Sequence, residues 1–165
     1  MYSIRKIEKK DNAVLATLIR DVFEEFDAPR AGTVFSDSTT DNLYELFLTP
    51  GSALWVAEDN GRVAGCCGVF PSKGLDNDTA ELVKFYTAKE SRGKGIGKQL
   101  IEKSIASAKE FGYEKLYIES LPVFSKAIAI YQQNGFLFLE RPLGSSAHPT
   151  CDVWMVKDLR GASGQ

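Results

Sequence analysis

Three glycines in the middle of the chain could hold a phosphate group. Gly93, Gly95 and Gly97 stand at alternate positions, directly after an apolar run typical of a buried strand and directly before the apolar spacing of an amphipathic helix. A glycine-rich turn that leads into a helix leaves several backbone N–H groups unpaired at the positive end of the helix dipole, which favours a pyrophosphate. The turn also carries three basic side chains, namely Arg92, Lys94 and Lys98.

The spacing of the glycines excludes two common phosphate-binding motifs. A Walker A loop has a glycine five residues before its Gly-Lys pair and a serine or threonine after it, whereas Gly97-Lys98 has Arg92 and Gln99 at these positions. A dinucleotide-binding turn reads G-x-G-x-x-G, which differs from the G-x-G-x-G found here. The pattern that fits is R-x-x-G-x-G, from Arg92 to Gly97. A glycine-rich turn without a ligand is the alternative.

A second motif lies further along the chain. Residues 127–136, AIAIYQQNGF, follow the pattern A-x-x-x-Y-x-x-x-G-F. Together with R-x-x-G-x-G and a preceding strand that carries Glu81, this motif resembles the GCN5-related N-acetyltransferase (GNAT) superfamily, of the bacterial small-molecule type. The resemblance spans nearly the whole chain. It implies that the glycine turn binds the pyrophosphate of acetyl-coenzyme A (acetyl-CoA) and that Tyr131 points at the coenzyme sulfur.

The resemblance also implies a set of coenzyme contacts. Backbone N–H groups of the strand near residues 85–87 would polarise the thioester carbonyl, and Ser120 and Ser125 would contact the pantetheine arm. The predicted coenzyme-binding residues are Phe85, Tyr86, Thr87, Arg92, Gly93, Lys94, Gly95, Ile96, Gly97, Lys98 and Ser125.

Glu81 is the first candidate for a general base. An alkyl amine with a pKa of about 10.4 is neutral in only about one molecule in a thousand at pH 7, so a nucleophilic amine must lose a proton. Glu81 lies eleven residues before Arg92, the spacing at which histone acetyltransferases of the superfamily carry their glutamate base, and the resemblance implies this role, acting through water. The alternatives are Glu119 on a neighbouring strand as the base, or Glu81 as a carboxylate that faces solvent or pairs with Lys84 or Lys115.

Tyr131 is the candidate proton donor for the leaving group. The departing thiolate of the coenzyme needs a proton or a hydrogen bond, and a tyrosine is a suitable donor because its pKa lies above that of a thiol. The alternative is a core aromatic residue on a helix face, which fits Phe124 and Phe136 better. Tyr131 and Glu81 are therefore the predicted catalytic residues.

The sequence defines the acceptor site least. The resemblance implies that it lies between residues 24–40 and the loop of residues 141–151. Acidic residues in the first range could hold a cationic amine or form a solvated helix end: Glu24, Glu25 and Asp27. Residues with the spacing H-x-x-C-x-x-W have no assigned role: His148, Cys151 and Trp154.

The apolar periodicity predicts a mixed α/β chain. Strands are expected at residues 2–7, 53–57, 62–70, 82–87, 115–121, 136–140 and 152–157, with an Asn60-Gly61 hairpin turn after the second. Helices are expected at residues 11–26 with Asp11 as the N-cap, from 40 or 41 to 47, from 96 to a C-terminal cap at Gly112, and at about 124–133. The order of these elements is also that of the superfamily. It implies a single-domain GNAT-like fold with a mixed central sheet of about six to seven strands and helices on both faces.

Length and charge limit the other classes of function. The 165 residues, 44% hydrophobic and 25% charged, suffice for one buried core, so we expect one domain over residues 1–160 and a flexible tail over 161–165. A net charge of −2 without a basic run argues against a nucleic-acid partner. Because no apolar leader and no bilayer-length segment is present, we expect a cytoplasmic protein without a membrane partner. The three cysteines and one histidine show no metal-binding spacing, and homodimer formation is left open.

The predicted activity is therefore that of an N-acetyltransferase. It would move an acetyl group from acetyl-CoA, as co-substrate, to a primary amine of a small molecule by direct attack in a ternary complex. The alternatives are a non-catalytic acyl-CoA sensor, and an acyltransferase with a different acyl donor or a peptide acceptor.

Overall fold

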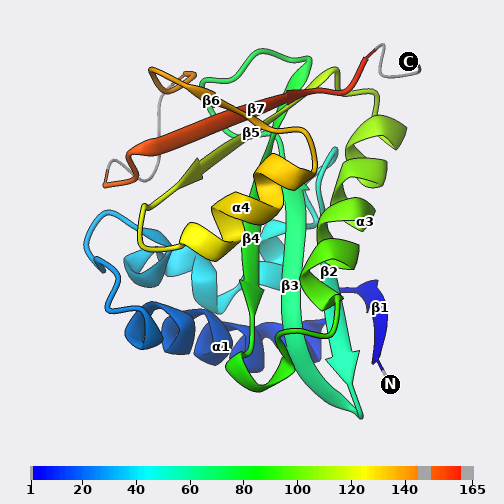
Figure 1. The fold of residues 1–165 in the computed structure, drawn as a ribbon. Coiled ribbons are helices and arrows are strands. Elements are labelled where there is room, and N and C mark those ends of the chain that lie inside the picture. The colour runs from blue at the N-terminus through cyan, green and yellow to red at the C-terminus, as the bar shows by residue number, and fades with distance from the viewer. Residues whose placement is uncertain (1, 145–149, 161–165) are drawn as a thin grey trace.

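A seven-stranded mixed sheet organises the chain (Figure 1). The computed structural model describes residues 2–144 and 150–160. The strands have the spatial order β1-β2-β3-β4-β5-β7-β6. Their bounds are β1 (Tyr2–Lys6), β2 (Ala53–Asp59), β3 (Arg62–Phe70), β4 (Thr79–Thr87), β5 (Lys115–Ser120), β6 (Leu137–Leu139) and β7 (Val153–Asp158). All seven strands that the sequence predicts are confirmed.

Helices cover both faces of the sheet (Figure 1). On one face, α1 (Asn12–Glu25) and the short α2 (Leu43–Leu46) enclose a buried apolar cluster with β2 and β3. On the other face, α3 (Ile96–Glu110) and α4 (Ser125–Gln133) enclose a second cluster. The predicted α/β class with helices on both faces is therefore confirmed, and the described residues form one domain.

The sheet opens between its two central strands. β4 and β5 are parallel, but they pair over only three residues, from Thr79–Lys115 to Glu81–Tyr117. Beyond this point β4 continues to Thr87 along β3, whereas β5 continues along β7. The two strands thus leave a space between them on the side where α3 and α4 begin.

A β-bulge interrupts β4 next to this opening. Cys66 on β3 pairs with Tyr86, but Gly68 pairs with Val83, so β4 carries one more residue than β3 over this stretch. Lys84 lies in the bulge with a φ of 58°, a left-handed conformation that is uncommon for a residue with a side chain. The thiol of Cys66 donates a hydrogen bond to the Lys84 carbonyl (3.0 Å), which holds the bulge against β3.

The starts of the first two helices differ from the sequence predictions. Asp11 precedes α1, but its carboxylate accepts hydrogen bonds from the Glu8 amide (2.7 Å) and the Arg5 guanidinium (2.8 and 3.0 Å) and does not cap the helix. The second helix is shorter than predicted because the chain first forms two 3-10 turns, Val34–Ser36 and Ser38–Asp41. The Asp11 carboxylate thus caps the 3-10 turn Lys9–Asp11 and pairs with Arg5, and it is not available to cap α1.

Some of the sequence predictions fall outside the described residues, namely the tail 161–165 and His148.

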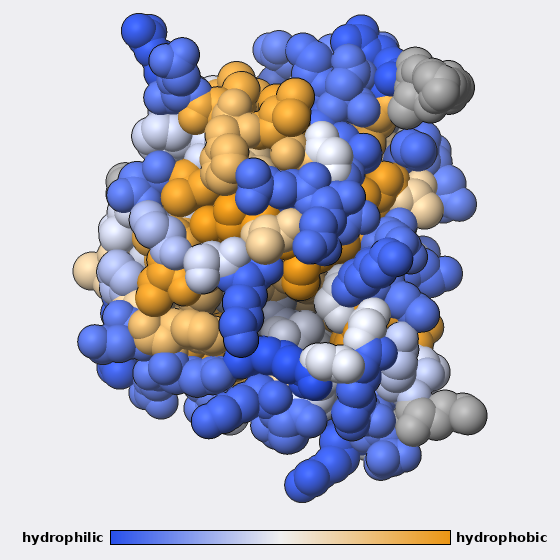
Figure 2. All heavy atoms as spheres, viewed as in Figure 1, coloured by the Kyte–Doolittle hydropathy of each residue, from blue (hydrophilic) through white to orange (hydrophobic). Residues whose placement is uncertain are grey.

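Within the described residues, no helix has the length and apolar character needed to cross a membrane. β6 is an edge strand of the sheet, and its residues Leu137 and Phe138 are exposed. Figure 2 shows hydrophobic surface in the region where Figure 1 draws β6 and α4.

Candidate active site

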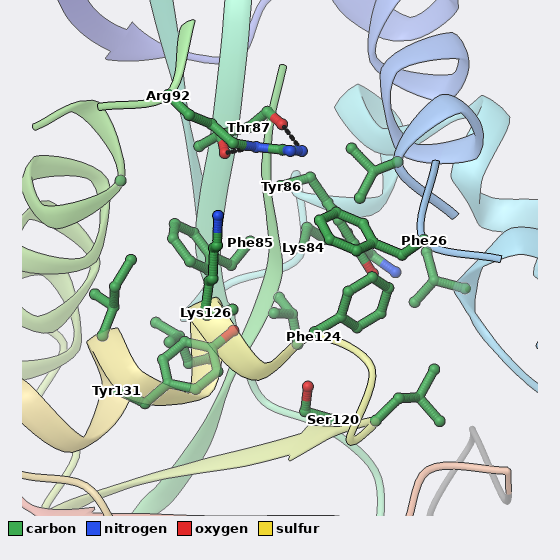
Figure 3. A pocket seen from close by; sticks show the side chains of 18 of the residues that line it. Phe26, Lys84, Phe85, Tyr86, Thr87, Arg92, Ser120, Phe124, Lys126 and Tyr131 are labelled. Carbon is green, nitrogen blue, oxygen red and sulfur yellow. Dashed lines mark hydrogen bonds between the residues drawn. The ribbon is translucent and has the colours of Figure 1, made fainter. Parts of the chain in front are cut away.

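A cavity of about 440 Å³ lies where β4 and β5 separate. Its walls come from β4, the glycine turn, α4, the end of β5 and the last turns of α1 (Figure 3). It brings together Glu81 and Tyr131, which are 50 positions apart in the sequence. All of the predicted coenzyme-binding residues line it except Lys94 and Ser125. Ser120, also predicted to contact the pantetheine arm, lines it as well.

The glycine turn has the geometry of an anion-binding helix start. Gly93 and Gly95 have φ values of 85° and 83°, which a residue with a side chain rarely adopts. Gly95 is the N-cap of α3, so the first-turn amides of this helix face the cavity without intrahelical partners. A Cβ atom on Gly97 would lie only 3.1 Å from Cζ of Phe85. Glycine is thus required here both for turn conformation and for close approach to β4.

Two of the three basic side chains at this turn have acidic partners within the protein. Arg92 forms a two-pronged ion pair with Glu25 on α1 (2.6 and 3.0 Å) and donates to the carbonyl oxygen (2.8 Å) and hydroxyl (3.2 Å) of Thr87 (Figure 3). Lys94 pairs with Asp59 at the end of β2. Lys98 is exposed at the cavity. Backbone amides and Lys98 are therefore the groups most directly available to an anion.

Tyr131 is buried in the wall that α4 contributes. Its ring packs against Phe85 (5.7 Å between centroids) and Phe136 (6.0 Å), and its hydroxyl forms no hydrogen bond with any residue that the structure describes. The hydroxyl points toward the cavity (Figure 3). Burial raises the pKa of Tyr131 well above its ordinary value, so the phenol remains protonated and can donate a hydrogen bond.

Glu81 lies at the inner end of the cavity, where β4 and β5 part. Ser72 Oγ donates a hydrogen bond to its Oε1 (2.6 Å). Burial raises the pKa of Glu81 to about 7, with a smaller contribution from the negative charge of Glu119. Glu119 also lines the cavity and accepts a hydrogen bond from the Tyr117 hydroxyl (2.9 Å). A carboxyl group with a pKa close to neutrality is well matched to accepting a proton, and Glu81 is not a solvent-facing carboxylate.

Comparisons with known proteins agree with this geometry. Residues 17–136 match the sequence model of the Acetyltransferase (GNAT) family. This chain belongs to that family. It is 34% identical over 157 residues, 94% of each chain, to the uncharacterized N-acetyltransferase YjgM of Escherichia coli (strain K12).

Solved structures show the same fold. A GNAT-family acetyltransferase from Staphylococcus aureus Mu50 has a TM-score of 0.84 at 23% identity, with 97% of this chain and 100% of that chain covered. The protein yncA of Salmonella typhimurium, solved with its cofactor acetyl-CoA, has a TM-score of 0.77 at 22% identity, with 96% of this chain and 94% of that chain covered. The chain is thus a GNAT-family N-acetyltransferase, and the predicted family resemblance is confirmed.

The side of the acetyltransferase cavity next to α1 is largely aromatic. Phe26, Tyr86 and Phe124 line it, with the Phe26 and Phe124 rings 5.7 Å apart. The acidic residues singled out in the sequence do not line it: Glu24 pairs with Arg30, Glu25 pairs with Arg92, and Asp27 is exposed. Cys151 lines the cavity, whereas Trp154 does not. Burial raises the pKa of the Cys151 thiol to about 12.

Two lysines also line the acetyltransferase cavity. The sequence analysis considered Lys84 only as an ion-pair partner of Glu81 and assigned no role to Lys126. Lys126 reaches the cavity from the first turn of α4, and Lys84 reaches it from the bulge of β4 (Figure 3). For Lys84 a signal was present, namely one basic residue inside the apolar run LVKFY. Within the described residues, no group of histidine, cysteine, aspartate and glutamate side chains could hold a metal ion.

Proposed function

We propose that this acetyltransferase moves the acetyl group of acetyl-CoA to the primary amine of a small molecule, by direct attack within a ternary complex. One observation carries the proposal: a single cavity connects the glycine turn, the Tyr131 hydroxyl and the Glu81 carboxyl group. A coenzyme and an acceptor could therefore occupy it at the same time. Direct transfer needs both molecules in contact, with the amine next to the thioester carbon.

The glycine turn is proposed to hold the pyrophosphate of the coenzyme. The left-handed backbone at Gly93 and Gly95 and the close approach of Gly97 to Phe85 support this proposal. Because no side chain projects from these three positions, an anion has room at the start of the helix. When bound, acetyl-CoA supplies an acetyl group activated as a thioester. Phe85, Tyr86 and Thr87 of β4 line the cavity between the turn and Glu81, and their strand is proposed to hold the thioester end.

Glu81 is proposed to take the proton from the acceptor ammonium. With a pKa of about 7 it is partly ionised at neutral pH, and Ser72 holds the carboxyl group in place. Removing this proton is the step that an alkyl amine cannot readily make alone at pH 7. Glu119, on the neighbouring strand, is the alternative base.

Tyr131 is proposed to stabilise the sulfur as the thioester bond breaks. Its hydroxyl, which has no hydrogen-bond partner among the described residues, could donate to the developing thiolate. Because its pKa is raised, a hydrogen bond is favoured over complete proton transfer. The aromatic residues on the α1 side of the cavity support a small acceptor with an apolar part.

The test is release of free coenzyme A thiol from acetyl-CoA across a panel of small amines, amino acids and short peptides. We expect turnover with a small amine. Tyr131→Phe should lower kcat by a factor on the order of 10² to 10⁴ while acetyl-CoA affinity stays near that of the wild type. Coenzyme binding without thiol release from any acceptor would indicate a sensor, and turnover with peptides alone would indicate a macromolecular acceptor.

A further inference from the structure

Lys84 is a buried cation that faces the cavity, and its ammonium contacts no acidic partner among the described residues. The residue is only 7% exposed, and its ammonium, which opens onto the cavity, forms no hydrogen bond or ion pair with any residue that the structure describes. An ammonium that has little contact with water and no acidic group against it is energetically unfavourable. A group of this kind is ready to bind an anion that enters the cavity.

The bulge of β4 directs Lys84 to this place. Leu82 and Phe85 pack into the core under α3, whereas Val83 and Tyr86 pack into the core under α1. Lys84 is therefore the residue that breaks the alternation of the strand, and it does so with a left-handed backbone. A strained backbone conformation that is held by its surroundings often marks a functional position. In Figure 3, Lys84 extends toward the side of the cavity where Phe26 and Phe124 lie.

Lys84 and Glu81 form a pair of opposite polar groups along one strand. They are three residues apart on β4, and the extra residue of the bulge lies in the same stretch of the strand. Both side chains line the cavity. Burial lowers the pKa of Lys84, while the charges of Asp37 and Glu81 act in the opposite direction, and an incoming anion would likewise favour the charged ammonium.

We propose that Lys84 binds a carboxylate of the acceptor, so that the substrate is an amino acid or another short amino carboxylate with an apolar side chain. The amine would face Glu81, the carboxylate would face Lys84, and the apolar part would contact Phe26, Tyr86 and Phe124. This inference rests on the proposed function, since it names the acceptor of the same site.

Matched pairs of acceptors test it. L-phenylalanine is compared with 2-phenylethylamine, and L-leucine with 3-methylbutylamine, at saturating acetyl-CoA. We expect kcat/KM to favour the amino acid by roughly 10- to 100-fold, the effect of one charge-assisted hydrogen bond. Lys84→Met should reduce this preference to near one. Lys126→Met removes another lysine at the same cavity and should leave the preference intact.

A binding measurement separates this inference from the proposed function. Calorimetric titration of 3-phenylpropanoate, which has a carboxylate but no amine, should show binding to the wild type and an affinity at least tenfold lower in Lys84→Met. The uncharged 3-phenylpropanamide is the control and should bind to neither protein. If no acceptor leads to release of coenzyme A thiol but 3-phenylpropanoate still binds, the proposed activity is refuted and the anion site at Lys84 is supported. Equal rates for both members of each pair, or an unchanged preference in a folded Lys84→Met, would overturn the inference. So would mass spectrometry that shows acetylation of Lys84 itself in place of acetylated acceptor.

Discussion

At the scale of single residues, we expect Glu81 to set how the rate depends on pH. Its pKa of about 7 means that the wild-type kcat/KM should rise between about pH 6 and pH 8, as the carboxyl group ionises. Glu81→Gln should remove this rise and lower the rate most near neutral pH. The loss should shrink as pH approaches the pKa of the free amine, because solution then supplies neutral amine. Measuring kcat/KM from pH 5.5 to pH 10 tests this expectation. If the pH profile of Glu81→Gln equals that of the wild type, the base is Glu119 or water.

Lys84 gives a second expectation, on stability. Its folded pKa lies below that of the unfolded chain, so the protonated lysine destabilises the fold at neutral and acidic pH, and the destabilisation fades as pH rises toward 10.5. Lys84→Met should therefore increase the free energy of unfolding at pH 7 by about 1–4 kcal/mol. The difference in the free energy of unfolding between Lys84→Met and the wild type should be smaller at pH 10. Urea unfolding at the two pH values measures it, and a variant less stable than the wild type at pH 7 would show that the ammonium has a stabilising partner.

At the scale of elements, the glycine turn and the start of α3 should carry coenzyme affinity. A Cβ atom on residue 97 would lie 3.1 Å from the Phe85 ring, so the valine of Gly97→Val would press against Phe85. It would also block the approach of the pyrophosphate to the backbone amides. Calorimetry should then detect little or no acetyl-CoA binding. Lys94→Ala is the matched control, because Lys94 already pairs with Asp59 and does not line the cavity, so its effect should be smaller. Equal affinities in the two variants would exclude the turn as the binding site.

The sequence predicts the elements and the glycine turn because both depend on local patterns. Apolar periodicity locates the strands and long helices, and Asn60-Gly61 locates the hairpin. Contacts between distant segments are not visible in that way. The ion pair of Arg92 with Glu25 joins residues 67 positions apart, so the guanidinium that the sequence assigns to a phosphate is held by α1.

Properties of the cavity depend even more on the assembled fold. The bulge at Lys84 is set by the register of β4 against β3, and the raised pKa of Glu81 is set by its burial at the point where β4 and β5 part. Neither follows from the identity of the neighbouring residues. The sequence therefore indicates a candidate catalytic carboxylate and a coenzyme. The feature on which the proposed acceptor depends, a buried ammonium without a contact to an acidic group in the described residues, is seen only in the three-dimensional structure.

At the scale of the whole molecule, the sheet consists of two parts that share little pairing. β1 to β4 form one part and β5 to β7 the other, and only three residue pairs of β4 and β5 join them within the described chain. A ligand between β4, β5 and α4 would bridge the two parts. At a concentration 100 times its dissociation constant, acetyl-CoA should stabilise the fold by about 2.7 kcal/mol.

This bridging predicts where amide hydrogen exchange should slow. With acetyl-CoA bound, we expect the largest added protection at residues 83–87 and 118–120. In these two segments β4 and β5 have separated and no longer pair with each other. The β2–β3 hairpin is the internal reference, because it is already paired along its length and should change less. Gly97→Val at the same concentration should show neither effect. Equal protection over both regions would mean that the coenzyme stabilises the fold without bridging the opening, and protection confined to the hairpin would place it outside the cavity.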